Sequence, residues 1–320
     1  MIARRAGLSS KEAATLLEEM AHKGLILRQQ SRKGTVRYMA AQYVVGIWEY
    51  QVDKLDRELI KDMNEYIPAL FAEAWKFPQM RTIPVGRSLS VQHKVLSHEK
   101  AEELVRSQKR FGVRPCICRQ EHAIMGEGCG KLLESCLVFG MAVDHDRALK
   151  VGREIDVQEA LHILQQADKE GLVLQPSNSR DIVWICCCCG CCCQILKNIK
   201  RHPRPASLVS TPFRATADSE TCSGCGICVD RCQMEAISLE SDTVLLNSDR
   251  CIGCGLCVST CPTGSLTLVR KPSTEQTEIP RDIYQASYKL AKTRGKLRPT
   301  SILKMMVRSK IDRLLAPKST

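Results

Sequence analysis

Near the N-terminus, the apolar positions predict one helix and one β-hairpin. Ser9, followed three residues later by Glu12, has the pattern of a capping box at a helix start. Apolar residues then recur at helical spacing up to Gly24, a residue type that favours a helix end. Apolar runs at 25–27 and 35–39 flank a polar Ser-Arg-Lys-Gly turn, which predicts two paired strands.

The same order of elements recurs 147 residues later in the chain. Asp156 and Glu159 repeat the capping pattern, and Gly171 follows an apolar helical face. Apolar runs at 172–174 and 182–185 predict a second hairpin, whose second strand leads directly into a run of cysteines. We interpret this as an internal structural repeat of a capped helix and a hairpin.

The C-terminal residues 271–320 predict a basic amphipathic tail that Pro299 divides into two pieces. From residue 270 to the end there are 13 Lys and Arg against 4 Asp and Glu, so this stretch carries +9 of the chain's net charge of +12. A helix of this kind favours docking on an acidic surface of a redox partner protein or on an anionic membrane surface. The alternative is a helix whose apolar face packs on the protein's own body. After Pro299, apolar and basic residues fall together at helical spacing: Ile302, Leu303, Lys304, Met306, Val307, Arg308, Lys310, Ile311, Arg313, Leu314 and Leu315.

Cysteine is the most informative part of the composition. The chain has 320 residues, room for two or three compact units, and 19 cysteines. The first residues lack the apolar core of a secretory signal, and no stretch approaches the ~18 apolar residues of a membrane-spanning helix. In a reducing cytosol, dense cysteines indicate metal binding more often than disulfides. We therefore predict a cytoplasmic metal-binding protein.

Eight of the cysteines form two copies of one pattern, C-x2-C-x2-C-x3-C, at an offset of 29 residues. The second copy ends in Cys-Pro, and the first has Gln233 in place of the proline. Zinc sites and disulfides are the alternatives, but paired four-cysteine runs at one shared offset fit iron–sulfur clusters better. The first copy is Cys222, Cys225, Cys228 and Cys232, and the second is Cys251, Cys254, Cys257 and Cys261.

This pattern resembles a bacterial-type ferredoxin domain with two [4Fe-4S] clusters, in which each run gives its fourth thiolate to the other cluster. The resemblance implies that Cys222, Cys225, Cys228 and Cys261 hold one cluster. It implies that Cys251, Cys254, Cys257 and Cys232 hold the second.

The other eleven cysteines do not match that spacing. One four-thiolate set predicted from the sequence is Cys116, Cys118, Cys129 and Cys136. A second draws on Cys188, Cys189, Cys191, Cys192 and Cys193, with Cys186 as a further candidate. These sets predict one or two additional iron–sulfur clusters, and a single unusual cluster sharing both sets is the alternative. Burial as small hydrophobic residues is the alternative for individual members.

The order of segments resembles that of multidomain bacterial iron–sulfur proteins. Such proteins have a winged-helix-like start, a Cys-Ile-Cys-Arg motif, a Cys-Cys-Gly-Cys-Cys-Cys run and a two-cluster ferredoxin domain. In that group the position of Cys187 is usually polar, which makes Cys187 the least trusted ligand.

The predicted fold class is α+β, in four parts. Residues 1–45 form a partial winged-helix-like segment and residues 46–210 a helical and cysteine-rich domain of mixed structure. Residues 211–270 form the two-cluster ferredoxin domain, and residues 271–320 the basic helical tail.

The predicted function is electron transfer to or from a redox partner, as a carrier or electron-transfer subunit rather than a stand-alone enzyme. One alternative is an oxidoreductase, or a subunit of one, with an active cluster or thiolate within residues 116–193. A second is a redox-responsive regulator. DNA binding is disfavoured because the helix at 11–23 carries three glutamates against two lysines, and glutamates repel phosphate.

Overall fold

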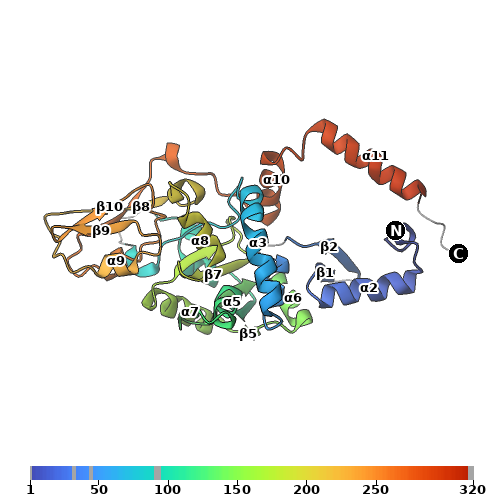
Figure 1. Ribbon diagram of the computed structural model, residues 1–320, viewed down its shortest axis with the longest axis horizontal. Helices are drawn as coiled ribbons and strands as arrows, with labels where there is room; N and C mark the ends of the chain where they lie inside the picture. The colour runs from blue at the N-terminus through green and yellow to red at the C-terminus, as the bar shows by residue number, and fades with distance from the viewer. Residues whose placement is uncertain (1, 31–33, 43–45, 90–94, 316–320) are drawn as a thin grey trace.

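The computed structural model describes residues 2–30, 34–42, 46–89 and 95–315. Along its longest axis, the segment with the repeated cysteine pattern lies at one end, and the N-terminal elements and the last helix lie at the other (Figure 1). A middle region, residues 46–210, lies between them. None of the helices in these described ranges is both long and apolar enough to cross a membrane.

The predicted N-terminal helix and strand pair are present, and a short helix that was not predicted precedes them. Ser9 accepts a hydrogen bond from the Glu12 amide and its own amide donates to the Glu12 side chain, so the capping box is present. The two strands pair antiparallel. The predicted turn at 31–33 lies outside the described residues, and the winged-helix assignment stays a prediction. The elements are α1 (Ile2–Ala6), α2 (Ser10–His22), β1 (Ile26–Gln30) and β2 (Val36–Ala40).

The middle region contains a five-stranded antiparallel sheet in the order β5-β3-β4-β7-β6, so it is mixed rather than mainly helical. Its strands are β3 (Phe111–Pro115), β4 (Glu134–Phe139), β5 (Arg153–Ile155), β6 (Val173–Pro176) and β7 (Trp184–Cys188). Its helices are α3 (Arg57–Ala74), α4 (Ala101–Arg106), α5 (Ile117–Ile124), α6 (Met141–Leu149), α7 (Val157–Lys169) and α8 (Gln194–Lys200). Short 3-10 turns lie at Glu49–Gln51, Gly86–Ser88, Ser97–Glu99 and Pro205–Leu208.

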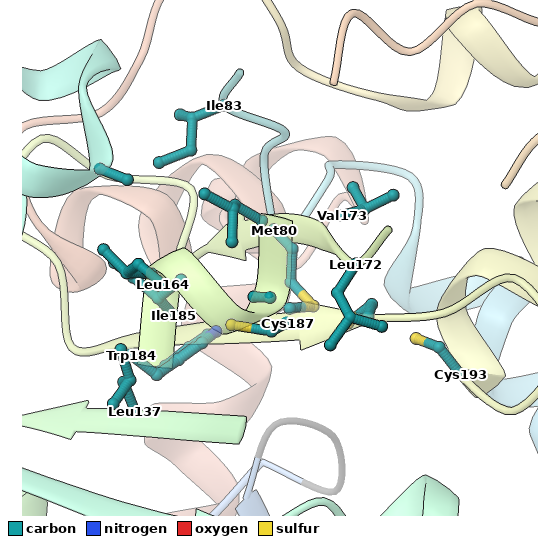
Figure 2. Close-up of a cluster of buried hydrophobic side chains, with 14 of the residues drawn as sticks. Met80, Ile83, Leu137, Leu164, Leu172, Val173, Trp184, Ile185, Cys187 and Cys193 are labelled. Carbon is teal, nitrogen blue, oxygen red and sulfur yellow. The ribbon is translucent and has the colours of Figure 1, made fainter. Parts of the chain in front are cut away.

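The predicted internal repeat of a capped helix and a hairpin is present in the secondary structure. Asp156 caps α7 by accepting a hydrogen bond from the Glu159 amide, and the antiparallel pair β6–β7 follows. Unlike β1–β2, this pair belongs to the larger sheet, where β7 lies between β4 and β6. The interior position of β7 places its cysteines in the main hydrophobic core. Figure 2 shows Cys187 and Cys193 in the same buried cluster as Met80 and Ile185.

The segment at 211–270, here called the repeat segment, consists of two antiparallel strand pairs, β8–β11 and β9–β10. Its elements are β8 (Phe213–Ala217), α9 (Ile227–Arg231), β9 (Ile237–Glu240), β10 (Thr243–Leu246), a 3-10 turn at Val258–Thr260 and β11 (Leu266–Arg270).

The tail forms two helices after a 3-10 turn at Ser273–Glu275: α10 (Ile283–Thr293) and α11 (Pro299–Leu315). Pro299 begins the second helix, as expected of a residue that fits the first helical turn. Arg5 donates hydrogen bonds to the carbonyl and hydroxyl of Ser309 and so links α11 to the N-terminal helix. Most apolar side chains of α11 are exposed, among them Leu303, Met306, Leu314 and Leu315.

Candidate metal centres

The eight repeated cysteines gather around two cavities. The first repeat group, Cys222, Cys225, Cys228 and Cys261, lines one cavity with an empty volume of about 290 Å³. Three of these thiols come from one run and the fourth from the other. Cys225 is exposed and Cys228 is buried, so this cavity lies close to the surface.

The second repeat group, Cys232, Cys251, Cys254 and Cys257, lines a second cavity. Backbone amides support its sulfurs: Ala236 donates to Cys232 Sγ over 3.2 Å, and Ala215 donates to Cys251 Sγ over 3.4 Å. Both groupings are the ones that the ferredoxin resemblance implies. Ligation of clusters by these thiolates stays a prediction.

Glycine is required at position 253, in the loop between Cys251 and Cys254. Gly253 has φ +66°, a left-handed conformation that side chains with a Cβ rarely adopt. A Cβ there would also overlap the carbonyl group of Phe213. The loop between Cys251 and Cys254 therefore lies directly against β8, which closes one side of the second repeat group.

In the middle region the cysteines separate into two groups. Cys129, Cys189, Cys191 and Cys192, here the four-thiol group, have sulfurs that all lie within 4.8 Å of one another. Cys189 and Cys192 are buried and Cys191 is exposed.

Seven other cysteines line one cavity, and all of them except Cys187 are here called the six-thiol group. Their side chains contact one another in series, from Cys116 through Cys118, Cys193, Cys188 and Cys186 to Cys136. The last two sulfurs are 4.0 Å apart. None of the six belongs to the four-thiol group.

This division differs from the one expected from spacing, which placed Cys129 with Cys116, Cys118 and Cys136. The reason is α5, a helix of eight residues that begins at Ile117 and spans ~12 Å. The glycine-rich loop holding Cys129 starts beyond the far end of α5 and approaches the turn after β7. The second expected set is divided too, because Cys188 and Cys193 join the six-thiol group while Cys189, Cys191 and Cys192 do not.

Cys187 packs in the hydrophobic core. Successive side chains of an extended strand point to opposite faces, so Cys187 points away from Cys186 and Cys188 on β7. Burial raises the pKa of its thiol to about 12, which keeps it protonated. The sequence made Cys187 the least trusted ligand, and that ranking stays a prediction.

Arg119 lies between the two middle groups, and the sequence reasoning gave it no role. Its guanidinium is buried and donates to the carbonyls of Leu132 and Cys187 and to Ser135 Oγ. Burial alone lowers its pKa, but thiolate charge at Cys116, Cys189 and Cys188 outweighs burial and raises the pKa overall. Arg119 therefore supplies a fixed positive charge to both groups. Its position directly after Cys118 is the signal that identifies it in the sequence.

The repeat segment docks on the middle region next to the four-thiol group. Gly190, between Cys189 and Cys191, donates its amide to Gln233 Oε1 over 2.6 Å. A Cβ on Gly190 would overlap the carbonyl oxygen of Gln233, the residue that follows Cys232. The backbones carrying the second repeat group and the four-thiol group are therefore in van der Waals contact.

Further hydrogen bonds hold this interface. The Val85 amide donates to the Cys254 carbonyl over 3.0 Å. Arg231, at the end of α9, donates to the carbonyls of Asp168 and Lys169, and its ion pair with the Asp168 carboxylate is 3.3 Å long. The position of the repeat segment on the middle region is thus fixed by both backbone and side-chain contacts.

Cysteine-lined cavities of this number and chemistry point to a metal-binding protein of the iron–sulfur class. Residues 221–273 match the family model described as a 4Fe-4S dicluster domain. The matched segment supports cluster binding and ferredoxin-like electron transport, so the chain carries an iron–sulfur electron-transfer domain. A search of curated proteins finds no match to the chain.

Proposed function

We propose that this chain is an electron-transfer protein that links a two-cluster ferredoxin domain to metal centres in its middle region. The first repeat group would hold one [4Fe-4S] cluster and the second repeat group another. When bound, such clusters accept and release single electrons at potentials that nearby charge and hydrogen bonds tune. The six-thiol group would hold an additional iron–sulfur cluster.

The contact of Gln233 with Gly190 is the observation that carries this proposal. It brings a proposed ligand of the repeat segment and two cysteines of the middle region into adjoining backbone positions. An isolated carrier does not require such a contact. A protein that passes electrons between two regions does.

Anaerobic purification with iron, sulfide and zinc analysis tests the proposal. The full chain should contain at least about eight irons with matching inorganic sulfide, and an EPR signal should appear on reduction. Cys225→Ala, at an exposed position, should lose one cluster without unfolding the chain. Cys187→Ala is the matched control and should keep every cluster. Stoichiometric zinc with no sulfide would overturn the proposal.

A second candidate function is an oxidoreductase whose active centre lies in the middle region. The exposure of Cys191 favours it, because a small oxidant or reductant could reach the four-thiol group from solvent. Turnover of small-molecule oxidants that Cys191→Ser abolishes, while Cys225→Ala only slows it, would favour this function over a simple carrier.

Helix α11 is the proposed docking element for an acidic redox partner. Its apolar side chains are exposed rather than packed on the body, which argues against the alternative of a purely structural helix. Lys304, Arg308 and Lys310 lie among them and add positive charge. The cysteine-rich composition supports a reducing, cytoplasmic location as part of the same proposal.

A further inference from the structure

The four thiols of Cys129, Cys189, Cys191 and Cys192 are spaced differently from every other cysteine group in the described residues. All four sulfurs lie within 4.8 Å of one another. Cys129 and Cys189 are 4.0 Å apart, and Cys191 and Cys192 are 3.8 Å apart. Neither repeat group nor the six-thiol group meets this spacing.

Sulfur spacing distinguishes one metal ion from a cluster. A tetrahedral ion with metal–sulfur bonds of ~2.3 Å places its four sulfurs ~3.8 Å apart. In a [4Fe-4S] cluster each thiolate binds a different iron at a corner of a cube, so the thiolate sulfurs lie farther apart. The distances in the four-thiol group fit a single ion, and the repeat groups do not have this close spacing.

The surroundings also suit a small, closed tetrathiolate site. The amides of Lys131 and Cys192 donate toward the sulfurs of Cys129 and Cys189. The buried guanidinium of Arg119 lies beside Cys189 and offsets negative charge that four thiolates leave on a divalent ion. Three of the thiols come from the turn at 189–192 and one from the loop after α5, so the ligands approach from two sides.

We propose that the four-thiol group binds one divalent metal ion, iron or zinc, through four thiolates, and that no cluster occupies this position. Tetrahedral sites with four sulfur ligands select these metals. The inference deepens the proposed function, because it identifies the centre that lies against the repeat segment. If the ion is iron, the site would accept and release one electron. If the ion is zinc, the site would hold in place the turn at 189–192, which contacts Gln233.

Difference measurements on the full chain, purified anaerobically, test the proposal. Iron, zinc and inorganic sulfide are measured per chain for the unaltered protein, for Cys191→Ser and for Cys129→Ser. Each variant should lose about one metal ion and no sulfide, because a single-ion site contains no inorganic sulfide. Cys187→Ala, which changes a buried cysteine outside the group, should change neither count.

Loss of about four irons with about four sulfides would show a cube and overturn the proposal. Unchanged metal content in both variants would overturn it as well. If the lost ion is iron, the high-spin ferric EPR signal that the unaltered protein gives after one-electron oxidation with ferricyanide should be missing in the variant; if zinc, the oxidised EPR spectrum should be unchanged. A chain with no sulfide at all would overturn the proposed function, yet loss of one zinc from Cys191→Ser would still support this site.

Discussion

In the repeat segment, three of the four thiols around each cavity come from one run, and the other run supplies the fourth. In the middle region, the six-thiol group draws on the start of α5, on β4, on β7 and on the residue before α8. A short run with glycine turns builds a site almost by itself. The middle groups exist only once a sheet and two helices have assembled.

The two regions also differ in what surrounds the thiols. The core of the repeat segment is small and includes Cys228, Cys251 and Cys257 among its buried residues. The core of the middle region is much larger and is mainly aliphatic. Metal binding should therefore contribute much of the free energy of folding of the repeat segment. The middle region should fold mainly through apolar burial, with metal binding as an addition.

Metal removal should separate the two regions most strongly. Stripping the full chain with acid or chelator under reducing conditions should unfold the repeat segment, because its small core includes three of the predicted ligands. Strands β3, β4 and β7 should keep their protection. Hydrogen exchange measured by mass spectrometry before and after stripping checks this, and equal protection in β8–β11 in both states would contradict it.

Blocking the interface is the second test. Gly190→Ala should place a Cβ on the Gln233 carbonyl oxygen and destabilise docking by ~1–3 kcal/mol, the cost of overpacking. Metal content should stay the same, while electron transfer between the two regions slows in stopped-flow reduction. Gly128→Ala is the matched control, because its Cβ would meet only ordinary contacts at 3.4 Å or more. Equal behaviour of the two variants would show that the close contact has no functional role.

A third test changes Arg231, which contacts the middle region at a second point of the interface. Arg231→Ala should destabilise docking by ~1.5–3 kcal/mol, the range for hydrogen bonds to charged groups. Arg214→Ala is the control, since its ion pair with Glu275 is more exposed and is worth ~0–1 kcal/mol. Limited proteolysis of the connection between α8 and β8, residues 201–212, measures docking. Faster cleavage in the control than in Arg231→Ala would contradict this assignment.

The smallest effect is expected at the tail. Reversing the charges of Lys304, Arg308 and Lys310 to Glu should slow reduction of an acidic partner at low ionic strength, with metal content unchanged. The difference from the unaltered chain should shrink at physiological salt, where screening acts over ~8 Å. Replacing Lys304 and Lys310 by Arg, with Arg308 kept, is the charge-conserving control. An equal loss of rate at both salt concentrations would point to lost apolar contact instead.

Much of the local structure could be predicted because its causes are local. Ser9 and Asp156 cap helices through side chains three residues from their partners, and Pro299 begins α11 by its fixed φ. The two cysteine runs of the repeat segment belong to the same category. Their spacing and glycines dictate the turns, and the matched dicluster family covers that segment.

The middle groups could not be predicted because contacts between distant elements create them. Neighbours in sequence, Cys188 and Cys189, belong to different groups, and so do Cys192 and Cys193. Cys129 joins residues 60 positions later in the chain because α5 separates it from Cys116. The spacing of cysteines along the sequence does not tell how long α5 is or where β7 ends, and both decide which thiols meet.

The sequence by itself determined the chemistry of this protein: soft thiolate ligands in numbers that only metal can explain, and two runs that define a dicluster domain. The tertiary structure alone decided which thiols lie together and which of these groups are adjacent. The physical reason is that ligand type is a property of single residues, whereas the distance between two sulfurs depends on sheet register, helix length and interface packing.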